Sequence, residues 1–462
     1  MENNKAKLDT HPFFALSIIL VIVGVAANFI PSGQFVREEV DGRTVVDPNS
    51  FIYIDNIGIG IGDFFLSFYN GFIDASSLMA MVLFIGGAFG VVKGINLLDV
   101  SATVLVNKLK NTGITFLTTV IMLIISLQVA ITGVWELSLV MIPLIIPICL
   151  KLGYDAMTGA ALVLISSCVG LSAAFTNPFF TAIAQEIAEL PLFSGMWFRI
   201  ITYAVFMSIS IFYVVRYAKK VKNNPSLSLV KEVTNKHKIA ELNDVKFTPR
   251  LIRAGVVFVL MFSFLIYGTV QMEFSFPEIS AVFVAAGLFT GLAYGARLNE
   301  ICHMFANGMK DLLIAALVIF FARAILYLME SSMILDTIIS VGAALITDLP
   351  AILAAPLIFI IQSVINFLIP SASGQAVITM PIITPLADIA GLNRQVAVYA
   401  SQLGDGLSNF IWPTNGAFLA VLAVAGIPYR KWFRFFFPLF MIIVLIAIIL
   451  VVIAHLINLG PF

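Results

Sequence analysis

Charge is scarce in this sequence. Only 11% of its 462 residues are Asp, Glu, Lys or Arg, and 60% are hydrophobic, whereas about 25% of the residues in a soluble domain are charged. The mean hydropathy is +1.03. This composition excludes an ordinary soluble domain and indicates an all-α polytopic membrane protein surrounded by the lipid bilayer. The net charge of zero gives no sign of a nucleic-acid partner, and we expect none.

Cysteine and histidine are also rare. Cys149, Cys168 and Cys302 stand among apolar residues without the spacing of a ligand set, and the four histidines form no cluster. We therefore expect no metal site, no organic cofactor and no thiol or imidazole catalysis. The longest soluble segment, 219–250, is too short for a catalytic or sensory domain, so we do not expect an enzyme.

Polar segments divide the chain into successive parts. The apolar run Phe13–Ile30 lacks a small-residue cleavage site and is expected to be a retained helix. Segment 219–250 has eight basic residues and three acidic ones, which is typical of a cytoplasmic linker. The predicted parts are a first span and external loop (1–62), a first repeat (63–218), the linker (219–250), two linking spans (251–298) and a second repeat (299–456).

The second repeat is visible within the sequence itself. Phe68–Asp74 recurs as Phe305–Asp311 at a spacing of 237, and Trp197-Phe198-Arg199 recurs as Trp432-Phe433-Arg434 at 235. A further set recurs at 238: Pro143, Pro147, Gly153, Thr176 and Asn177 as Pro381, Pro385, Gly391, Thr414 and Asn415. An ordered series with near-constant spacing indicates a duplication.

The distribution of charge indicates the orientation of the two copies. If residues 113–151 and 351–388 are re-entrant hairpins that do not cross the membrane, five crossings separate the copies, which are then inverted. This option places the basic clusters inside and a stretch with Glu330, Asp336 and Asp348 outside. The prediction is nine crossings and two re-entrant hairpins, with a cytoplasmic N-terminus and an external C-terminus.

Four irregular stretches interrupt the apolar runs: 132–138, 172–178, 369–375 and 404–416. Irregular backbone persists at membrane depth only where it lines a cavity or is buried in protein. In secondary transporters such stretches bind substrate, because half-helix N-termini attract anions and unwound carbonyls bind cations. The candidate substrate-binding residues are Thr132, Glu136, Thr176, Asn177, Ser371, Ser373, Gly374, Gln375, Asp405, Ser408, Asn409, Trp412, Thr414 and Asn415.

Two carboxylates stand out in these stretches, Glu136 and Asp405, and no Lys or Arg accompanies them. They favour a substrate with a cationic end, whose carboxylate rests on the Ser/Gly-rich stretch 371–375. Arg323 is the only mid-span arginine, and we expect it to pair with a carboxylate between helices; contact with substrate is the alternative. Trp197 and Trp432 are expected to be interfacial anchors.

The second half carries the residues of a known family. The runs Pro370–Ala376, Met380-Pro381-Ile382, Gly404-Asp405-Gly406 and Ala425–Tyr429 look like the YfcC-like branch of the DcuC-type anaerobic carriers. The resemblance implies membership of the ion-transporter superfamily and a homodimer that works by an elevator motion. It also implies that interfacial helices at 96–110 and 331–346 serve as arms between the scaffold and the moving unit.

The resemblance leaves two substrate classes. DcuC-like members are associated with C4-dicarboxylates, and YfcC-like members with basic amino acid exchange, such as arginine for ornithine. The superfamily's Ser-Asn-Thr signature is only partly present here, as Ser408-Asn409 and two Thr-Asn pairs. Together with Glu136 and Asp405, this departure from the superfamily signature favours an inner-membrane exchanger of a basic amino acid. The alternative is a C4-dicarboxylate carrier coupled to H⁺ or Na⁺.

Overall fold

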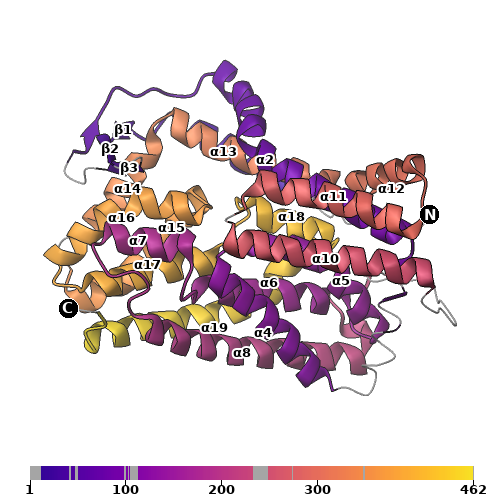
Figure 1. The fold of residues 1–462 in the computed structure, drawn as a ribbon. Coiled ribbons are helices and arrows are strands. Elements are labelled where there is room, and N and C mark those ends of the chain that lie inside the picture. The colour runs from indigo at the N-terminus through magenta and orange to yellow at the C-terminus, as the bar shows by residue number, and fades with distance from the viewer. Residues whose placement is uncertain are drawn as a thin grey trace, which may run out of the picture.

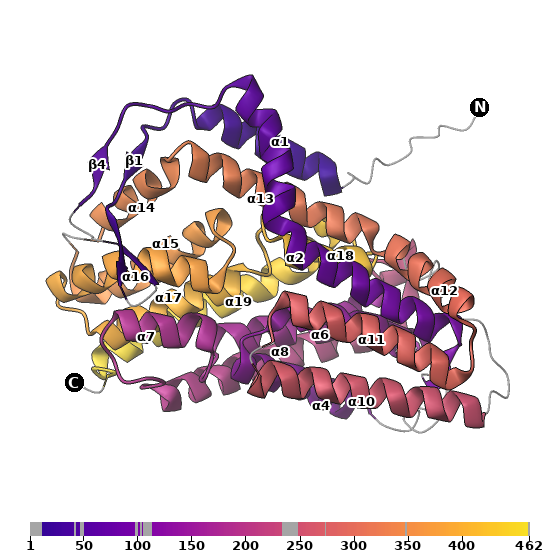
Figure 2. The ribbon, with the colours of Figure 1, turned by 45° about the horizontal axis from the view of Figure 1, so that its top comes forward.

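A computed structural model describes residues 12–460, except 41–42, 47–49, 98–99, 102–103, 105–112, 233–247, 273 and 347–348. Most of the predicted arm 96–110 therefore lies outside the described residues. The described part is mostly helical, with long helices arranged side by side (Figures 1 and 2). Two short antiparallel ribbons, β1 (Gly33–Gln34) with β4 (Ile52–Tyr53) and β2 (Arg37–Val40) with β3 (Arg43–Val46), lie in the loop after the first helix.

The helices follow in two series. The first series is α1 (Pro12–Ala26), α2 (Ile61–Gly94), α4 (Ile114–Thr132), η1 (Trp135–Leu137), α5 (Ser138–Lys151), α6 (Ala156–Ser172), η2 (Pro178–Ala182), α7 (Ile183–Ile187), α8 (Met196–Asn223) and η3 (Pro225–Leu227). The second series is α10 (Pro249–Gln271), α11 (Phe276–Tyr294), α12 (Leu298–Asp311), α13 (Leu313–Ser331), α14 (Ile334–Ala344), α15 (Ala351–Leu368), α16 (Ala372–Ile389), α17 (Arg394–Ser408), α18 (Gly416–Val424) and α19 (Tyr429–Leu456).

The centre of the protein is formed by α6 and α17, which contact each other. Every residue of α6 is buried, and so is every residue of α17 after Arg394. Helices α4 and α5 both pack against α6, and α15 and α16 both pack against α17. Helices α8 and α19 contact each other and run side by side along one edge in Figure 1. The predicted hairpins thus flank the two central helices.

A second group of helices packs through glycines. Helix α2 contacts α11, α12 and α13. A Cβ at Gly90 would lie 2.4 Å from the Met304 carbonyl oxygen, and one at Gly308 would lie 2.1 Å from the Gly86 carbonyl oxygen. Small residues allow helix backbones to approach closely in membranes. This group therefore forms a tightly packed wall, which meets the helices of the hairpins and breaks mainly where α13 contacts α18.

The loop between α1 and α2 is fastened to the start of α14. Arg37 donates two hydrogen bonds to the buried Asp336 carboxylate, at 2.8 and 2.7 Å, and the Phe35 amide donates a third at 3.0 Å. The Gly33 amide donates to the carbonyl oxygen of Met333, which has a left-handed φ of 53°. These bonds fix the turn by which the chain passes from α13 into α14, within the predicted arm 331–346.

Backbone features recur at the spacing of the sequence repeat. Gly153 and Gly391, 238 residues apart, both have left-handed φ angles, of 83° and 69°. Asn177 and Asn415, at the same spacing, both cap the N-terminus of the helix that follows a break. Both second hairpin arms, α5 and α16, carry two prolines inside the helix. The repeat therefore extends from sequence to local structure.

Within the described residues, seven helices are long and apolar enough to cross a membrane: α2, α4, α8, α11, α13, α15 and α19. Five of them coincide with predicted crossings. The other two, α4 and α15, are the first arms of the predicted hairpins, since length and apolar composition do not distinguish a hairpin arm from a crossing. The remaining predicted crossings correspond to α1, α10 and the interrupted pairs α6–α7 and α17–α18.

Replacing Gly90 by Ala tests the glycine packing. We expect the variant to unfold at lower temperature in detergent, because the new methyl group would overlap the α12 backbone, and overpacking costs about 1–3 kcal/mol. Gly62→Ala in the same helix is the control, since no atom lies within 4 Å of its Cβ position. The control is expected to unfold at the same or a slightly higher temperature. Equal melting temperatures for both variants would contradict the close packing.

Candidate functional site

A cavity of about 290 Å³ lies where the predicted irregular stretches meet the glycine-packed group of helices. One part of the lining comes from residues 133–136, 370–373, 409 and 414–417, which belong to both predicted hairpin tips, to the second break and to the start of α18. The other wall comes from α2, α11 and α13, together with the segment before α11, and Phe179 of η2 also lines the cavity. Ligand pockets have volumes from about 300 Å³ upward, so this cavity suits one small metabolite.

The first tip lies against the first break. Gly133 ends α4 with a φ of 72°, and a Cβ there would lie 2.3 Å from the Asn177 Oδ1 atom. Thr132 fastens the tip by donating to the Gln128 carbonyl oxygen at 2.9 Å, while its hydroxyl accepts from the Val134 amide at 3.2 Å. The tip residue Glu136 is partly buried and lines the cavity.

The second tip presents the N-terminus of α16 to the cavity. Ser371 caps this helix, and its hydroxyl accepts from the Gly374 amide at 3.4 Å. Both Ser371 and Ser373 line the cavity. The positive end of a helix dipole and its free amides attract an anion, so this tip is suited to a carboxylate.

The second break adds a chain of buried amides. The Asn415 Nδ2 group donates to Asn409 Oδ1 at 2.7 Å, and Asn409 Nδ2 donates to the Asp405 carbonyl oxygen at 2.9 Å. Asn409, Thr414 and Asn415 line the cavity, and the buried hydroxyl of Thr414 has no hydrogen-bond partner among the described residues. A ligand in the cavity is a natural partner for this hydroxyl, because buried polar atoms are rarely left unsatisfied.

Asp405 lies one layer behind the cavity. Its side chain is 1% exposed and its Oδ1 atom accepts from Asn366 Nδ2 at 2.7 Å and from Asn409 Nδ2 at 3.3 Å. Gln375 continues this layer, accepting from Asn366 at 3.2 Å. Asn409 is thus the only one of these residues that both lines the cavity and contacts Asp405.

The remaining predicted site residues satisfy backbone groups. Asn177 accepts from the Phe179 amide at 2.8 Å, Thr176 donates to the Ile131 carbonyl oxygen at 3.4 Å, and Ser408 donates to that of Gly404 at 2.6 Å. The Trp412 Nε1 group donates to the Ser363 carbonyl oxygen at 2.6 Å. These residues hold the tips and breaks in shape, one layer away from the cavity lining.

Arg323 joins the cavity from the opposite wall, outside every irregular stretch. We predicted an ion pair with a carboxylate between helices. Instead, the guanidinium forms no ion pair or hydrogen bond with any residue that the structure describes. A signal was present in the sequence, because Ile319, Ala322, Arg323 and Leu326 all line the cavity and have the i, i+3, i+4, i+7 spacing of one helix face.

Comparison with known proteins identifies the family. The family model described as DcuC, C4-dicarboxylate anaerobic carrier, matches residues 11–456, nearly the whole chain. The chain belongs to the DcuC family. It is therefore a multi-pass membrane transporter and not an enzyme.

Two relatives match most of this DcuC-family chain. It is 30% identical over 457 residues to the Escherichia coli (strain K12) protein named "Putative basic amino acid antiporter YfcC", covering 90% of each chain. It is 27% identical over 411 residues to an uncharacterized protein of Haemophilus influenzae (strain ATCC 51907 / DSM 11121 / KW20 / Rd), covering 87% of this chain and 80% of that protein.

Two solved structures overlay on the DcuC-family chain at low scores. Neisseria gonorrhoeae MtrF, described among a class of antimetabolite efflux pumps, gives a TM-score of 0.42 at 19% identity and covers 98% of this chain and 97% of that chain. Alcanivorax borkumensis YdaH, described as a transporter, gives 0.40 at 16% identity, covering 98% and 100%. Scores below 0.5 do not establish a shared arrangement of helices.

Both breaks of the DcuC-family chain are supported by side chains of the helices that follow them. At the second break, Trp432 Nε1 donates to the Phe410 carbonyl oxygen at 3.0 Å, and the Tyr429 hydroxyl donates to that of Ile411 at 2.7 Å. Trp432 is fully buried, so its predicted role as an interfacial anchor is wrong; Trp197, its sequence counterpart, is 56% exposed.

At the first break the support is indirect. Gln402 Nε2 donates to the Ala174 carbonyl oxygen at 2.6 Å, while its Oε1 atom accepts from Arg199 Nε on α8 at 2.7 Å. Arg199 occupies the fourth position of α8, and Trp432 occupies the fourth position of α19. Both residues therefore lie in the first turn of their helices, and Arg199 acts on the first break through Gln402 whereas Trp432 acts on the second break directly.

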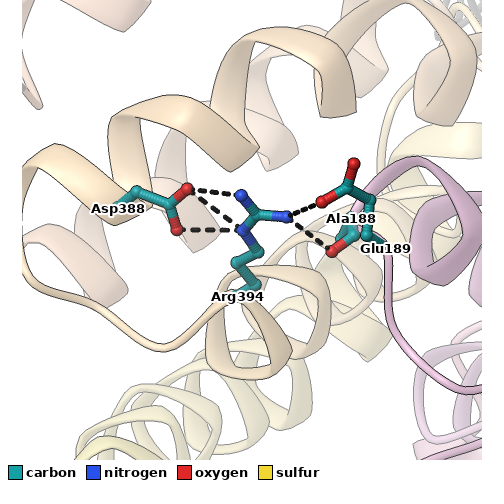
Figure 3. A network of polar contacts seen from close by, with 4 residues as sticks. All are labelled: Ala188, Glu189, Asp388 and Arg394. Carbon is teal, nitrogen blue, oxygen red and sulfur yellow. Dashed lines mark hydrogen bonds and ion pairs between the residues drawn. The ribbon is translucent and has the colours of Figure 1, made fainter. Parts of the chain in front are cut away.

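Arg394 connects the end of the second hairpin with the loop after the first break (Figure 3). Its guanidinium donates to both Asp388 carboxylate oxygens and to Glu189 Oε2 and the Ala188 carbonyl oxygen. This network joins elements from the two repeats at the protein surface.

Replacing Trp432 by Phe tests the support of the second break. The substitution keeps the ring packing and leaves the buried Phe410 carbonyl oxygen without its donor, which costs about 1–3 kcal/mol. We expect a lower melting temperature in detergent. Trp197→Phe is the matched control, because an exposed substitution changes stability by less than about 0.5 kcal/mol. Equal losses in both variants would show that the hydrogen bond to Phe410 contributes nothing.

Proposed function

We propose that this DcuC-family transporter exchanges basic amino acids, of the arginine and ornithine type, across the inner membrane. The supporting observation is that a carboxylate, Glu136, and an anion-binding tip, Ser371–Ser373, line one small cavity. A basic amino acid has a cation at one end and a carboxylate at the other. In this proposal Glu136 binds the cationic end, and the amides and hydroxyls of the second tip bind the carboxylate.

An elevator motion of a homodimer is the proposed mechanism. The cavity lies at the boundary between two groups of helices: the hairpins with α6 and α17, and the glycine-packed α2, α11, α12 and α13. A rigid second group is suited to act as the scaffold, and the first group to carry the substrate. Helix α14, fastened at Asp336 to the loop between α1 and α2, is suited to be an arm between them.

The inverted-repeat topology belongs to the same proposal. Shared left-handed residues, capping asparagines and proline pairs at the repeat spacing support two copies of one unit. With nine crossings and two re-entrant hairpins, the N-terminus is cytoplasmic and the C-terminus external. The first and second tips then approach the cavity from opposite faces of the membrane, as in inverted-repeat transporters.

A C4-dicarboxylate carrier is the second candidate function, and Arg323 is the observation that favours it. A guanidinium in the cavity can bind a second carboxylate. Glu136, however, would repel a dianion in the same small cavity, so this function requires H⁺ or Na⁺ to accompany the substrate.

Counterflow in proteoliposomes separates the two candidates. Vesicles loaded with unlabelled ornithine are expected to accumulate labelled arginine, and vesicles loaded with succinate are not expected to accumulate labelled succinate. Empty vesicles containing the same protein give the background. Exchange of succinate without exchange of arginine or ornithine would refute the proposed function.

Replacing Glu136 by Gln tests its contact with the cationic end. Hydrogen bonds to charged groups contribute about 1.5–3 kcal/mol, so arginine exchange is expected to fall by roughly 10- to 100-fold. Competition by citrulline, which resembles arginine but carries no side-chain charge, is expected to change little. Glu136→Asp, which keeps the charge, is the control. An equal loss for arginine and citrulline would exclude a charge contact at Glu136.

Asp405 is the proposed site for a coupling ion, H⁺ or Na⁺, because it is buried one layer behind the cavity and linked to it by Asn409. Asp405→Asn is expected to remove the response of transport to an imposed proton or sodium gradient while leaving substrate binding within about threefold. Asp311→Asn, an exposed carboxylate near Lys93, is the control. An unchanged gradient response in Asp405→Asn would exclude this role.

A further inference from the structure

Arg323 is the charged cavity residue to which the proposed contacts with a basic amino acid assign no role. It lies on α13, in the wall that faces both hairpin tips, and is partly buried. Its guanidinium interacts electrostatically with Glu330, two helical turns further along α13, but no described carboxylate lies within ion-pair distance of it. An arginine at membrane depth costs about 2.5–3.5 kcal/mol, and such residues ordinarily have a partner.

The backbone that carries Arg323 is held firmly. A Cβ at Gly71 of α2 would lie 2.5 Å from the amide nitrogen of Ala324, the residue next to Arg323. On another face of α13, a Cβ at Gly416 of α18 would lie 2.9 Å from the Ile319 Cα atom. The contact with α2 holds α13 within the glycine-packed group, and the contact at Gly416 marks the boundary with the group that carries the second break. The Arg323 guanidinium therefore extends into the cavity from a rigid support.

The anion that fits Arg323 is indicated by the opposite wall. Ser371 and Ser373 of the second tip line the same cavity, with the N-terminus of α16 behind them. Both Arg323 and this tip attract negative charge, whereas Glu136 attracts positive charge. A carboxylate has two oxygen atoms and can bind a guanidinium and a helix N-terminus at the same time.

We infer that Arg323 binds the substrate's carboxylate from the wall opposite the second tip, so that the carboxylate lies between Arg323 and Ser371–Ser373. This inference rests on the proposed exchange of basic amino acids and adds a residue that determines specificity. The substrate then bridges the two groups of helices, and its contact with Arg323 breaks when these groups move apart. A diamine or agmatine, which lacks the carboxylate, leaves Arg323 without an anion and is rejected.

Replacing Arg323 by Gln in the full-length protein tests this role. The assay is the inhibition of labelled arginine uptake by unlabelled arginine and by agmatine, which differs from arginine only in lacking the carboxylate. In the unaltered protein we expect arginine to compete at least tenfold better than agmatine. In Arg323→Gln the half-inhibitory concentration of arginine is expected to rise by roughly 10- to 100-fold and that of agmatine to change by less than threefold.

Two further variants make the result specific. Arg323→Lys keeps the charge and is expected to retain most of the preference for arginine, which shows that the protein still folds. Arg434→Gln is the matched control, because Arg434 is exposed on α19 and does not line the cavity. It is expected to leave both inhibition constants unchanged. If Arg323→Gln exchanges arginine with an unchanged preference over agmatine, the inference is wrong even though the proposed function stands.

If the proposed exchange of basic amino acids is wrong, the unaltered protein exchanges no arginine or ornithine. The same variants are then measured with labelled succinate. Loss of succinate exchange in Arg323→Gln, with retention in Arg323→Lys and Arg434→Gln, supports Arg323 as a carboxylate-binding residue in a dicarboxylate carrier. Succinate exchange at the unaltered rate in Arg323→Gln overturns the inference.

Discussion

The structure depends on side-chain hydrogen-bond donors for the backbone carbonyl groups that lose their helical partners where helices are interrupted inside an apolar protein. Helices α6 and α17 are buried along their length, and each ends at a break where carbonyl groups lose their helical partners. In lipid such groups cost several kcal/mol each, so other parts of the protein supply donors. Gln402 supplies one to Ala174, and Trp432 and Tyr429 supply them to Phe410 and Ile411. These donors stabilise the non-helical conformation of the two breaks, and other polar groups of the second break line the cavity.

Local features of the fold could be predicted from the sequence because they depend on local chemistry. Asn177 and Asn415 cap helices, and Gly153 and Gly391 adopt left-handed conformations, as expected where a repeated unit needs the same turn. The sequence predicted less where tertiary packing decides. Trp432 is buried because of where α19 begins, and the wall opposite the tips comes from α13, distant from them in sequence. Composition at the breaks therefore identified one wall of the cavity, whereas the other wall was indicated only by the mid-span Arg323 and the helical spacing around it.

The two tips occupy equivalent places in the repeat and carry different chemistry. At a spacing of 238, Glu136 corresponds to Gly374, and Gly133 corresponds to Ser371. One tip therefore contributes a carboxylate, and the other contributes hydroxyls and a capped helix N-terminus. A pair of identical tips would favour a symmetric ligand. The observed difference places a carboxylate and a capped helix N-terminus, which is suited to an anion, in one cavity, and this favours a substrate with unlike ends.

The net charge of the moving part also affects whether the protein exchanges substrates or takes them up. In the proposed mechanism Glu136 and Asp405 move with the hairpins, while Arg323 stays with the scaffold. When both carboxylates are ionised, the moving part carries two negative charges if empty and one if it holds a basic amino acid. Because each charge at membrane depth costs about 2.5–3.5 kcal/mol on insertion scales, the empty unit crosses less readily than the loaded one. This difference favours exchange over net uptake. A bound dicarboxylate would instead give the moving part four negative charges, so several coupled cations would have to move with it. The two carboxylates therefore favour a cationic substrate on electrostatic grounds.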